Sequence, residues 1–213
     1  MSDFIRARSN EQKEKRMEEI KNATDALFDS QPYHKITLTT IADKLNSSRA
    51  NLYKYVTTKE EIFLELSADK RTAYFDSLKA AFPIGCNYSV EVFAQVWAGI
   101  LNSHRSYLQY SDILLTIIET NVSVERLAAF KKNYYKDAGE IIILLSNNLN
   151  ISTEKAEDLF YAVYYHAIGM NGSCFKNPLV QQALKLLNME IVEMDFQQSM
   201  KEFILMCLNY YCQ

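Results

Sequence analysis

The sequence comprises 213 residues, enough to bury a sizeable core arranged as one domain or as two small ones. It contains only 5 glycines and 3 prolines, which favours long uninterrupted helices over hairpin-rich β structure. The formal net charge is −3, and the absence of any run of about 18 apolar residues excludes a bilayer-spanning helix.

The first predicted element is an amphipathic helix over residues 9–30. Met17, Ile20, Thr24 and Leu27 recur at helical spacing, and charged residues occupy the other side. Pro32 ends this helix, because the residue before a proline is disfavoured in the α conformation. Residues 1–8 are predicted to be frayed. The first 60 residues carry a slight positive excess and the rest of the chain a negative one.

A short helix and a tight turn are predicted after the loop that contains Pro32. Ile41 and Leu45 lie on one apolar face, and Thr37 stands where a helix N-cap is needed. Asn46 is expected at positive φ, because after glycine it tolerates the left-handed conformation best.

A second short helix is predicted from Ser48 to about Tyr55, capped by Ser47. Arginine pairs with guanine edges, asparagine with adenine edges, and serine and lysine reach phosphates. The side chains left pointing outward are Ser48, Arg49, Asn51 and Lys54. A second helix that presents such groups is the helix-turn-helix arrangement for reading the major groove of DNA.

Thr57 or Thr58 is expected to cap the long helix that begins at Lys59. A cation in the first turn of a helix is not stabilised by the helix dipole, which favours anions there. A phosphate bound beside Lys59 and the free backbone amides would compensate for the positive charge at this end of the helix.

The stretch from Thr37 to Glu60 resembles the DNA-binding signature of the tetracycline-repressor (TetR) family, and the match extends from about Lys13 to Leu66. Asn46 stands where the family usually has glycine. The resemblance implies that ten residues line the DNA side: Thr37, Ser47, Ser48, Arg49, Ala50, Asn51, Tyr53, Lys54, Tyr55 and Lys59. It also implies that the tyrosines and lysines mostly grip phosphates, while the residues around Arg49–Asn51 meet bases.

The long helix over residues 59–82 is predicted to act as a lever of roughly 36 Å between two domains. The expected domains are a helix-turn-helix domain, residues 1–58, and a helical ligand-binding and dimerisation domain, residues 59–213. Helical stripes continue after Ser89, and Asp112 is expected to cap a short buried helix over residues 113–121. Further helices are expected from Ser123, from Ser152, near residues 178–187 and at the C-terminus. The predicted fold class is therefore all-α, with about nine to ten helices.

The last two long helices carry more apolar surface than one layer of a bundle needs. Two copies packing these faces together would form a four-helix interface, although both helices could instead close the core of one protomer. The resemblance implies the same interface in a homodimer. The predicted interface residues are Phe160, Tyr164, Met200, Phe203, Ile204, Cys207 and Tyr211.

Aromatic residues are abundant on the helices after residue 82, and pockets between bundle helices are lined in this way. His104 and His166 lie in apolar stripes and can equally be satisfied core histidines. Glu119 follows a very apolar run, so it lies either at the surface or facing a cavity where it meets a ligand. The candidate pocket residues are Phe93, Trp97, His104, Tyr107, Glu119, Tyr134, Tyr164 and His166.

The chain contains no catalytic, nucleotide-binding or metal-ligand motif, so no enzyme activity, metal or cofactor is expected beyond a small-molecule effector. The four cysteines form no C-x-x-C pair, which indicates free thiols in a reducing cytosol, and the N-terminus has no signal region. The resemblance implies a cytoplasmic, nucleoid-associated protein of bacterial type. The favoured function is a ligand-released repressor that binds a palindromic operator as a homodimer. Two alternatives are a ligand-independent DNA-binding protein and a helical interaction protein that does not bind DNA.

Overall fold

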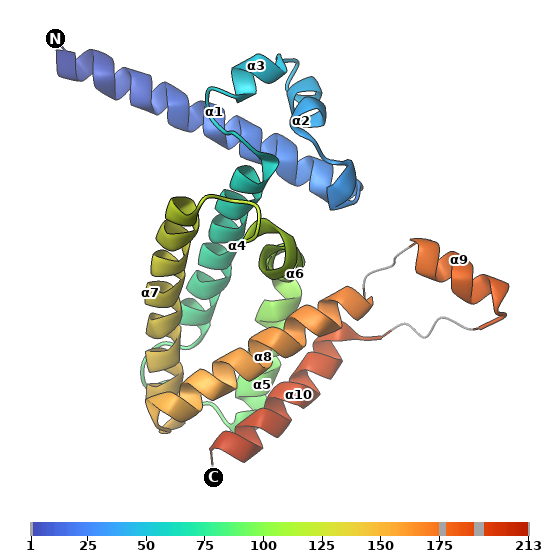
Figure 1. Ribbon diagram of the computed structural model, residues 1–213. Helices are drawn as coiled ribbons and strands as arrows, with labels where there is room; N and C mark the ends of the chain where they lie inside the picture. Colours follow the sequence, from blue (N-terminus) through green and yellow to red (C-terminus); the bar gives the residue numbers. More distant parts are fainter. Residues whose placement is uncertain (1, 175–177, 190–193, 213) are drawn as a thin grey trace. The chain divides into compact units, whose positions relative to one another are not determined.

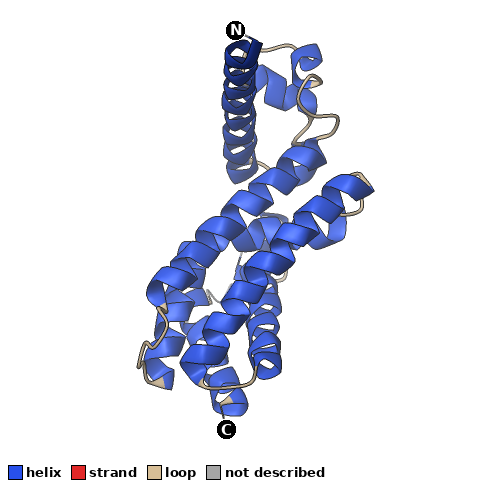
Figure 2. Ribbon diagram, turned by 90° about the vertical axis from the view of Figure 1, so that its left-hand side faces the viewer, coloured by secondary structure: helices blue, strands red, loops and turns tan. Residues whose placement is uncertain are grey.

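The computed structural model describes residues 2–174, 178–189 and 194–212. The chain is 81% helical, and its described part contains no strand (Figure 2). The predicted all-α class is therefore confirmed. No helix within the described residues is long and apolar enough to cross a bilayer.

The elements follow one another with short connections, as Figure 1 shows. In chain order they are α1 (Ser2–Ser30), the 3-10 turn η1 (Tyr33–Lys35), α2 (Leu38–Lys44), α3 (Arg49–Leu52), α4 (Lys59–Ala81), α5 (Val90–Ser103), α6 (Arg105–Ile113), the π-helical turn η2 (Leu114–Ile118), α7 (Val124–Leu149), α8 (Thr153–Cys174), α9 (Pro178–Leu186) and α10 (Phe196–Tyr211).

The chain divides into two compact units. The N-terminal unit contains the chain up to Asp69 together with Ile113–Phe130, and the C-terminal unit contains Lys70–Asp112 and the chain from Lys131 onward. The three divisions fall inside helices: within α4, at the last residue of α6 and within α7. The predicted boundary at residue 58 remains a prediction.

In the N-terminal unit, α2 and α3 lie on the same side of α1 (Figures 1 and 2). Each of these helices contributes fully buried apolar side chains, among them Ile20, Ile41 and Leu52. Phe63 of α4 is also buried, and its ring meets the edge of Phe28 at a centroid distance of 5.2 Å. The apolar face read from the helical spacing of α1 is therefore the face that supports the two short helices.

In the C-terminal unit, α10 packs against α5 and α8. The views agree that α8 and α10 run side by side in opposite directions (Figure 1). Trp97 of α5 is fully buried at the centre of this core, and its indole N–H donates to the hydroxyl of Tyr74 at 2.9 Å. Phe82 stacks on Phe93 with centroids 4.0 Å apart.

Three local predictions were wrong. Helix α1 begins at Ser2, because nothing in residues 1–8 breaks a helix, whereas fraying was expected there. The stripe after Ser89 is interrupted at His104, whose N–H bonds to two carbonyls of α5 and ends that helix. Asp112 lies inside α6, the residue that precedes the next helical turn is Ile113, and the segment that follows is half exposed, since Leu115 faces solvent.

Cys86, Cys207 and Cys212 are free thiols, as predicted. The side chain of Cys174 lies outside the described residues.

Candidate DNA-binding surface

Helix α2 begins and ends at the residues that the sequence indicates. The Thr37 hydroxyl accepts the N–H of Thr40 at 3.1 Å, and the Thr40 hydroxyl accepts the N–H of Thr37 at 2.9 Å, which forms a reciprocal capping box. Asn46 has φ of 48°, so the predicted left-handed turn is confirmed. The Ser47 N–H then donates to the carbonyl of Ala42, which closes the turn before α3.

The cap of α3 is Ser48 rather than Ser47. The Ser48 hydroxyl accepts the N–H of Asn51 at 3.3 Å, and the regular helix spans only Arg49–Leu52 before it loosens into a turn. Leu52 is fully buried and anchors this helix. The side chains left exposed form one contiguous surface: Ser48, Arg49, Ala50, Asn51, Tyr53 and Lys54.

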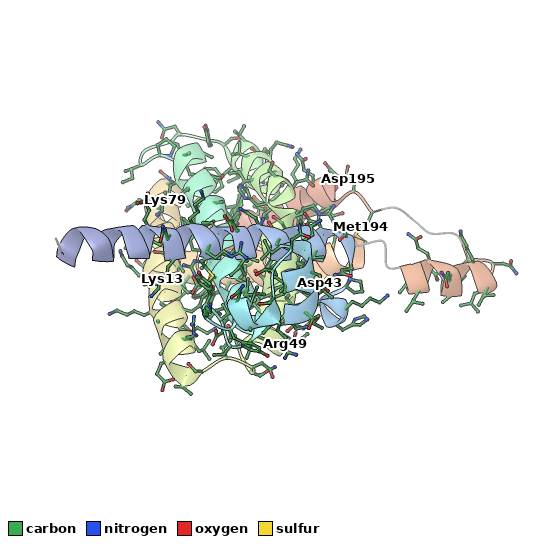
Figure 3. The ribbon with its side chains drawn as sticks, turned by 90° about the horizontal axis from the view of Figure 1, so that it is seen from above. Lys13, Asp43, Arg49, Lys79, Met194 and Asp195 are labelled. Atoms are coloured by element: carbon green, nitrogen blue, oxygen red, sulfur yellow. The ribbon has the colours of Figure 1, made fainter. Side chains whose placement is uncertain are left out.

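The Arg49 guanidinium is held by its own helix. Its Nη2 donates to the hydroxyl of Tyr53, and its carbon atom Cζ lies 5.2 Å from the centre of that ring. Residues four apart lie on one face of a helix, so the pair restricts the rotamers of Arg49. Figure 3 shows Arg49 on α3 and the exposed Asp43 on the neighbouring α2.

Lys59 is engaged inside the protein. Its ammonium donates to the carbonyls of Tyr33 at 3.0 Å and Ile36 at 2.8 Å, and it lies 3.7 Å from the centre of the Tyr33 ring. The Tyr33 hydroxyl donates to Glu60 at 2.5 Å. Burial lowers the pKa of Lys59, against the opposing effect of the Glu60 charge. Lys59 thus ties the loop before α2 to the start of α4.

The free backbone N–H groups and the positive dipole end at the start of α4 are also satisfied by side chains of the protein itself. Thr58 accepts the N–H of Glu61, and the buried Glu61 carboxylate accepts the N–H and the hydroxyl of Thr57 at 2.9 and 2.7 Å. Arg126, at the start of α7 and in the same unit, lies 3.2 Å from Glu61 and 3.9 Å from Glu65. A carboxylate at this position stabilises the helix N-terminus.

Three of the candidate pocket residues form a tyrosine cluster in the C-terminal unit. Tyr107 of α6 stacks between Tyr74 and Tyr164, at centroid distances of 5.1 and 6.0 Å, and donates a hydrogen bond to Tyr164. Tyr134 of α7 donates to Tyr161 of α8. Burial raises the pKa of Tyr107 and Tyr134 well above 10, so both stay neutral hydrogen-bonding groups.

Two of the other candidate pocket residues adjoin this cluster through Tyr74: Trp97 donates to its hydroxyl, and the ring of His104 lies 5.8 Å from its ring, edge to face. Phe93 and Trp97 are core side chains of α5. The Nε2 atom of His104 lies 2.8 Å from the Ser77 hydroxyl, and burial lowers the pKa of this histidine. His166 stacks on Phe203 at 3.6 Å, and burial lowers its pKa as well. Glu119 belongs to the N-terminal unit, where it is half-buried.

The predicted dimer residues lie at different depths within one protomer. Within a single protomer five of them are already buried in the core: Phe160, Tyr164, Met200, Ile204 and Cys207. Phe203 and Tyr211 are only partly buried. The i, i+4, i+7 pattern identified the apolar face of each helix correctly, and the place of these residues in a dimer interface stays a prediction.

Comparisons with known proteins agree with this geometry. Residues 20–66 match the family described as bacterial regulatory proteins, tetR family, and residues 68–209 match the tetracyclin repressor-like C-terminal domain. The chain belongs to the TetR family. Its helix-turn-helix is accordingly that of a DNA-binding transcriptional regulator, as the resemblance implied.

One solved structure shares the TetR fold along most of its length. It is the fatty acid degradation regulator FadR from Bacillus halodurans, with a TM-score of 0.56 and 14% identity over 90% of this chain and 94% of that one. At this identity the likeness concerns the fold alone. No curated protein matches the chain.

Sequence reasoning missed two ion pairs of this TetR chain. Arg71 of α4 is 4% exposed and donates to Asp137 of α7 at 2.9 Å, inside the C-terminal unit. Its place in the stripe that contains Tyr74 and Leu78 was a usable signal for a buried cation. No signal in the sequence indicated the pairing of Arg126 with Glu61, since the two residues are far apart in sequence. Within the described residues no cluster of acidic, histidine or cysteine side chains suits a metal ion.

Proposed function

We propose that this TetR-family chain is a ligand-released repressor that binds a palindromic operator as a homodimer. The observation that carries the proposal is the exposed surface of α3, where Arg49 and Asn51 flank Ala50 on a helix anchored by Leu52. Arginine and asparagine are the side chains that pair with guanine and adenine in the major groove. Lys54 and Tyr55 follow and supply phosphate contacts.

We place the dimer interface on the outward sides of α8 and α10. Phe203, Met206 and Tyr210 follow one another on α10 at helical spacing, and Tyr210 is 72% exposed. His166 of α8 stacks against Phe203 and continues this stripe. Apolar side chains that recur on an exposed helical face are expected to be covered by a partner, and a two-fold dimer matches a two-fold operator.

We propose that the effector binds in the C-terminal unit beside the tyrosine cluster of Tyr74, Tyr107, Tyr134 and Tyr164. Aromatic rings with several hydroxyls are the usual lining of small-molecule sites between helices. The effector acts by a population shift, because only its difference in affinity between the DNA-competent and DNA-incompetent states performs work.

The deciding experiment is selection of DNA by the full-length protein from a random pool. The expected product is an inverted repeat whose half-sites lie about 34 Å apart, one turn of DNA. Arg49→Ala should weaken binding to that site by about 1–3 kcal/mol and relax the preference at one base pair of each half-site. Enrichment of no sequence, or equal losses for Arg49→Ala on selected and random DNA, would remove the base-reading role.

A further inference from the structure

The guanidinium of Arg71 is a buried cation at the edge of the tyrosine cluster, inside the C-terminal unit. Arg71 is 4% exposed, and its Nη2 donates to Asp137 of α7 at 2.9 Å. Its Cζ atom lies 5.8 Å from the centre of the Tyr134 ring, and the ammonium of Lys131 lies 6.0 Å from the centre of the same ring. A buried guanidinium is costly unless a carboxylate faces it, so this part of the core requires an anion.

Asp137 is the accessible member of the ion pair. Its side chain is 29% exposed, whereas that of Arg71 is 5% exposed. A carboxylate that leaves the pair regains its hydration, but the guanidinium stays inside the protein and needs a replacement. Exchange of Asp137 for a carboxylate from solution therefore costs less than loss of the pair, and an uncharged molecule cannot make that exchange.

Aromatic side chains continue from Arg71 along the same face of α4. Tyr74 and Phe75 follow three and four residues later, roughly 5 Å further along the helix axis. Both rings meet Tyr107 of α6, at centroid distances of 5.1 and 6.5 Å, and Phe75 also meets Phe160 of α8 at 6.0 Å. A cation beside a wall of aromatic rings suits a molecule with an anionic head and an apolar body.

We propose that the effector is an organic carboxylate whose head displaces Asp137 from Arg71 and whose apolar body lies against Phe75 and Tyr107. The planar guanidinium donates two parallel hydrogen bonds to a carboxylate, which fixes the direction of the ligand. In the exchange, α7 gives up one of the ion pairs that join it to α4, the helix beside it (Figure 1). The proposal rests on the proposed effector site in the tyrosine cluster and names the chemical class of its ligand.

Calorimetric titration and thermal unfolding of the full-length protein test this class of ligand. The probes are benzoate, phenylacetate, phenylbutyrate, hexanoate and octanoate, each compared with its uncharged amide at about pH 7.5, where the acids are ionised. At least one carboxylate should bind and raise the melting temperature, whereas its amide should do neither. A panel in which no carboxylate binds, or in which the amides bind equally well, overturns the proposal.

Two acidic residues of α7 provide a matched pair of variants. Asp137→Asn removes the carboxylate that competes for Arg71 and should tighten binding of the carboxylate probe about 10-fold. Glu140 lies three residues further on and pairs with Lys79 of α4 at 2.7 Å in a more exposed position. Glu140→Gln removes the same charge and should change the affinity less than about twofold.

The two variants separate an exchange at Arg71 from a change in net charge. Equal effects of Asp137→Asn and Glu140→Gln, or weaker binding by Asp137→Asn, would overturn the exchange. Arg71→Lys keeps the buried charge but loses the planar fork, so the carboxylate should bind about 10-fold more weakly. Unchanged affinity of that variant would also overturn the proposal, and circular dichroism establishes that all three variants fold.

The proposed repressor function is tested separately by its DNA. A carboxylate that binds at Arg71 without weakening binding to the selected operator keeps the anion site and overturns its role as the effector site. Amides that release the operator keep the effector site and overturn the carboxylate class. Selection of no DNA sequence overturns the repressor, while the titrations still decide whether the anion site exists.

Discussion

At the scale of single residues, Tyr53 controls the geometry of Arg49. Its hydroxyl accepts from Nη2 and its ring faces the guanidinium, so Tyr53→Phe should leave the cation in place but free its orientation. We expect discrimination against a wrong base at the Arg49 position to fall by about 1 kcal/mol, the worth of one hydrogen bond.

Binding to random DNA separates this role from a phosphate contact. If Tyr53 orients Arg49, Tyr53→Phe leaves the affinity for random DNA unchanged and has no further effect on an Arg49→Ala background. A uniform loss on every sequence would show instead that the tyrosine hydroxyl contacts the DNA backbone.

Lys59 provides a second test at this scale. Because its ammonium already donates to the carbonyls of Tyr33 and Ile36, Lys59→Ala should lower the free energy of unfolding by about 1–2 kcal/mol. The dependence of DNA affinity on salt should not change. A salt slope reduced by about one would show that Lys59 contacts a phosphate in the complex.

At the scale of elements, the turn between α2 and α3 depends on one backbone conformation. Asn46 has φ of 48°, where a β-branched side chain clashes and glycine does not. Asn46→Val should therefore destabilise the protein by about 1–2 kcal/mol, whereas Asn46→Gly should stay within about 0.5 kcal/mol of wild type. Chemical denaturation measures both, and equal losses would contradict the left-handed turn.

The helix termini show what a sequence can predict. Thr37 and Ser152 cap the helices at which the pattern places them, since a cap involves only neighbouring residues. The break at His104 could not be found in this way, because the apolar stripe continues across it. A related distinction applies to the predicted dimer residues: periodicity shows that a face is buried but not which chain buries it.

The same distinction applies to the candidate sites. The exposed set on α3 was readable because Leu52 alone anchors that short helix and leaves its neighbours outward. The candidate pocket residues were chosen for their aromatic character. Tertiary packing placed Phe93 in the core and His166 beside Phe203, and no local signal specifies either outcome.

At the scale of the whole molecule, two histidines make stability depend on pH. Burial lowers the pKa of His104 and His166 below the ordinary value of 6.5, so near that pH the unfolded chain binds more protons than the folded one. Their contribution to stability is complete above about pH 6.5 and is lost as the pH falls below it.

Melting temperatures measured at about pH 7.5 and about pH 5.5 test this dependence. We expect the melting temperature to fall on acidification, and the double variant His104→Gln, His166→Gln to lose less than wild type. Both rings are partly exposed, so the difference should be small. An identical fall in the two proteins would assign the pH dependence to carboxylates alone.

The ion pair between Arg126 and Glu61 bears on whether the helix-turn-helix part of the chain, here called the head, can fold as a separate fragment. A fragment that stops at Asp69 keeps all three helices of the motif, yet it lacks the cation that faces the buried carboxylate at the start of α4. Glu61 would then keep only its hydrogen bonds to Thr57, which loosens the first turn of that helix. The head is thus built from two stretches of chain separated by Lys70–Asp112, and it cannot be excised as one continuous piece without losing part of its own support.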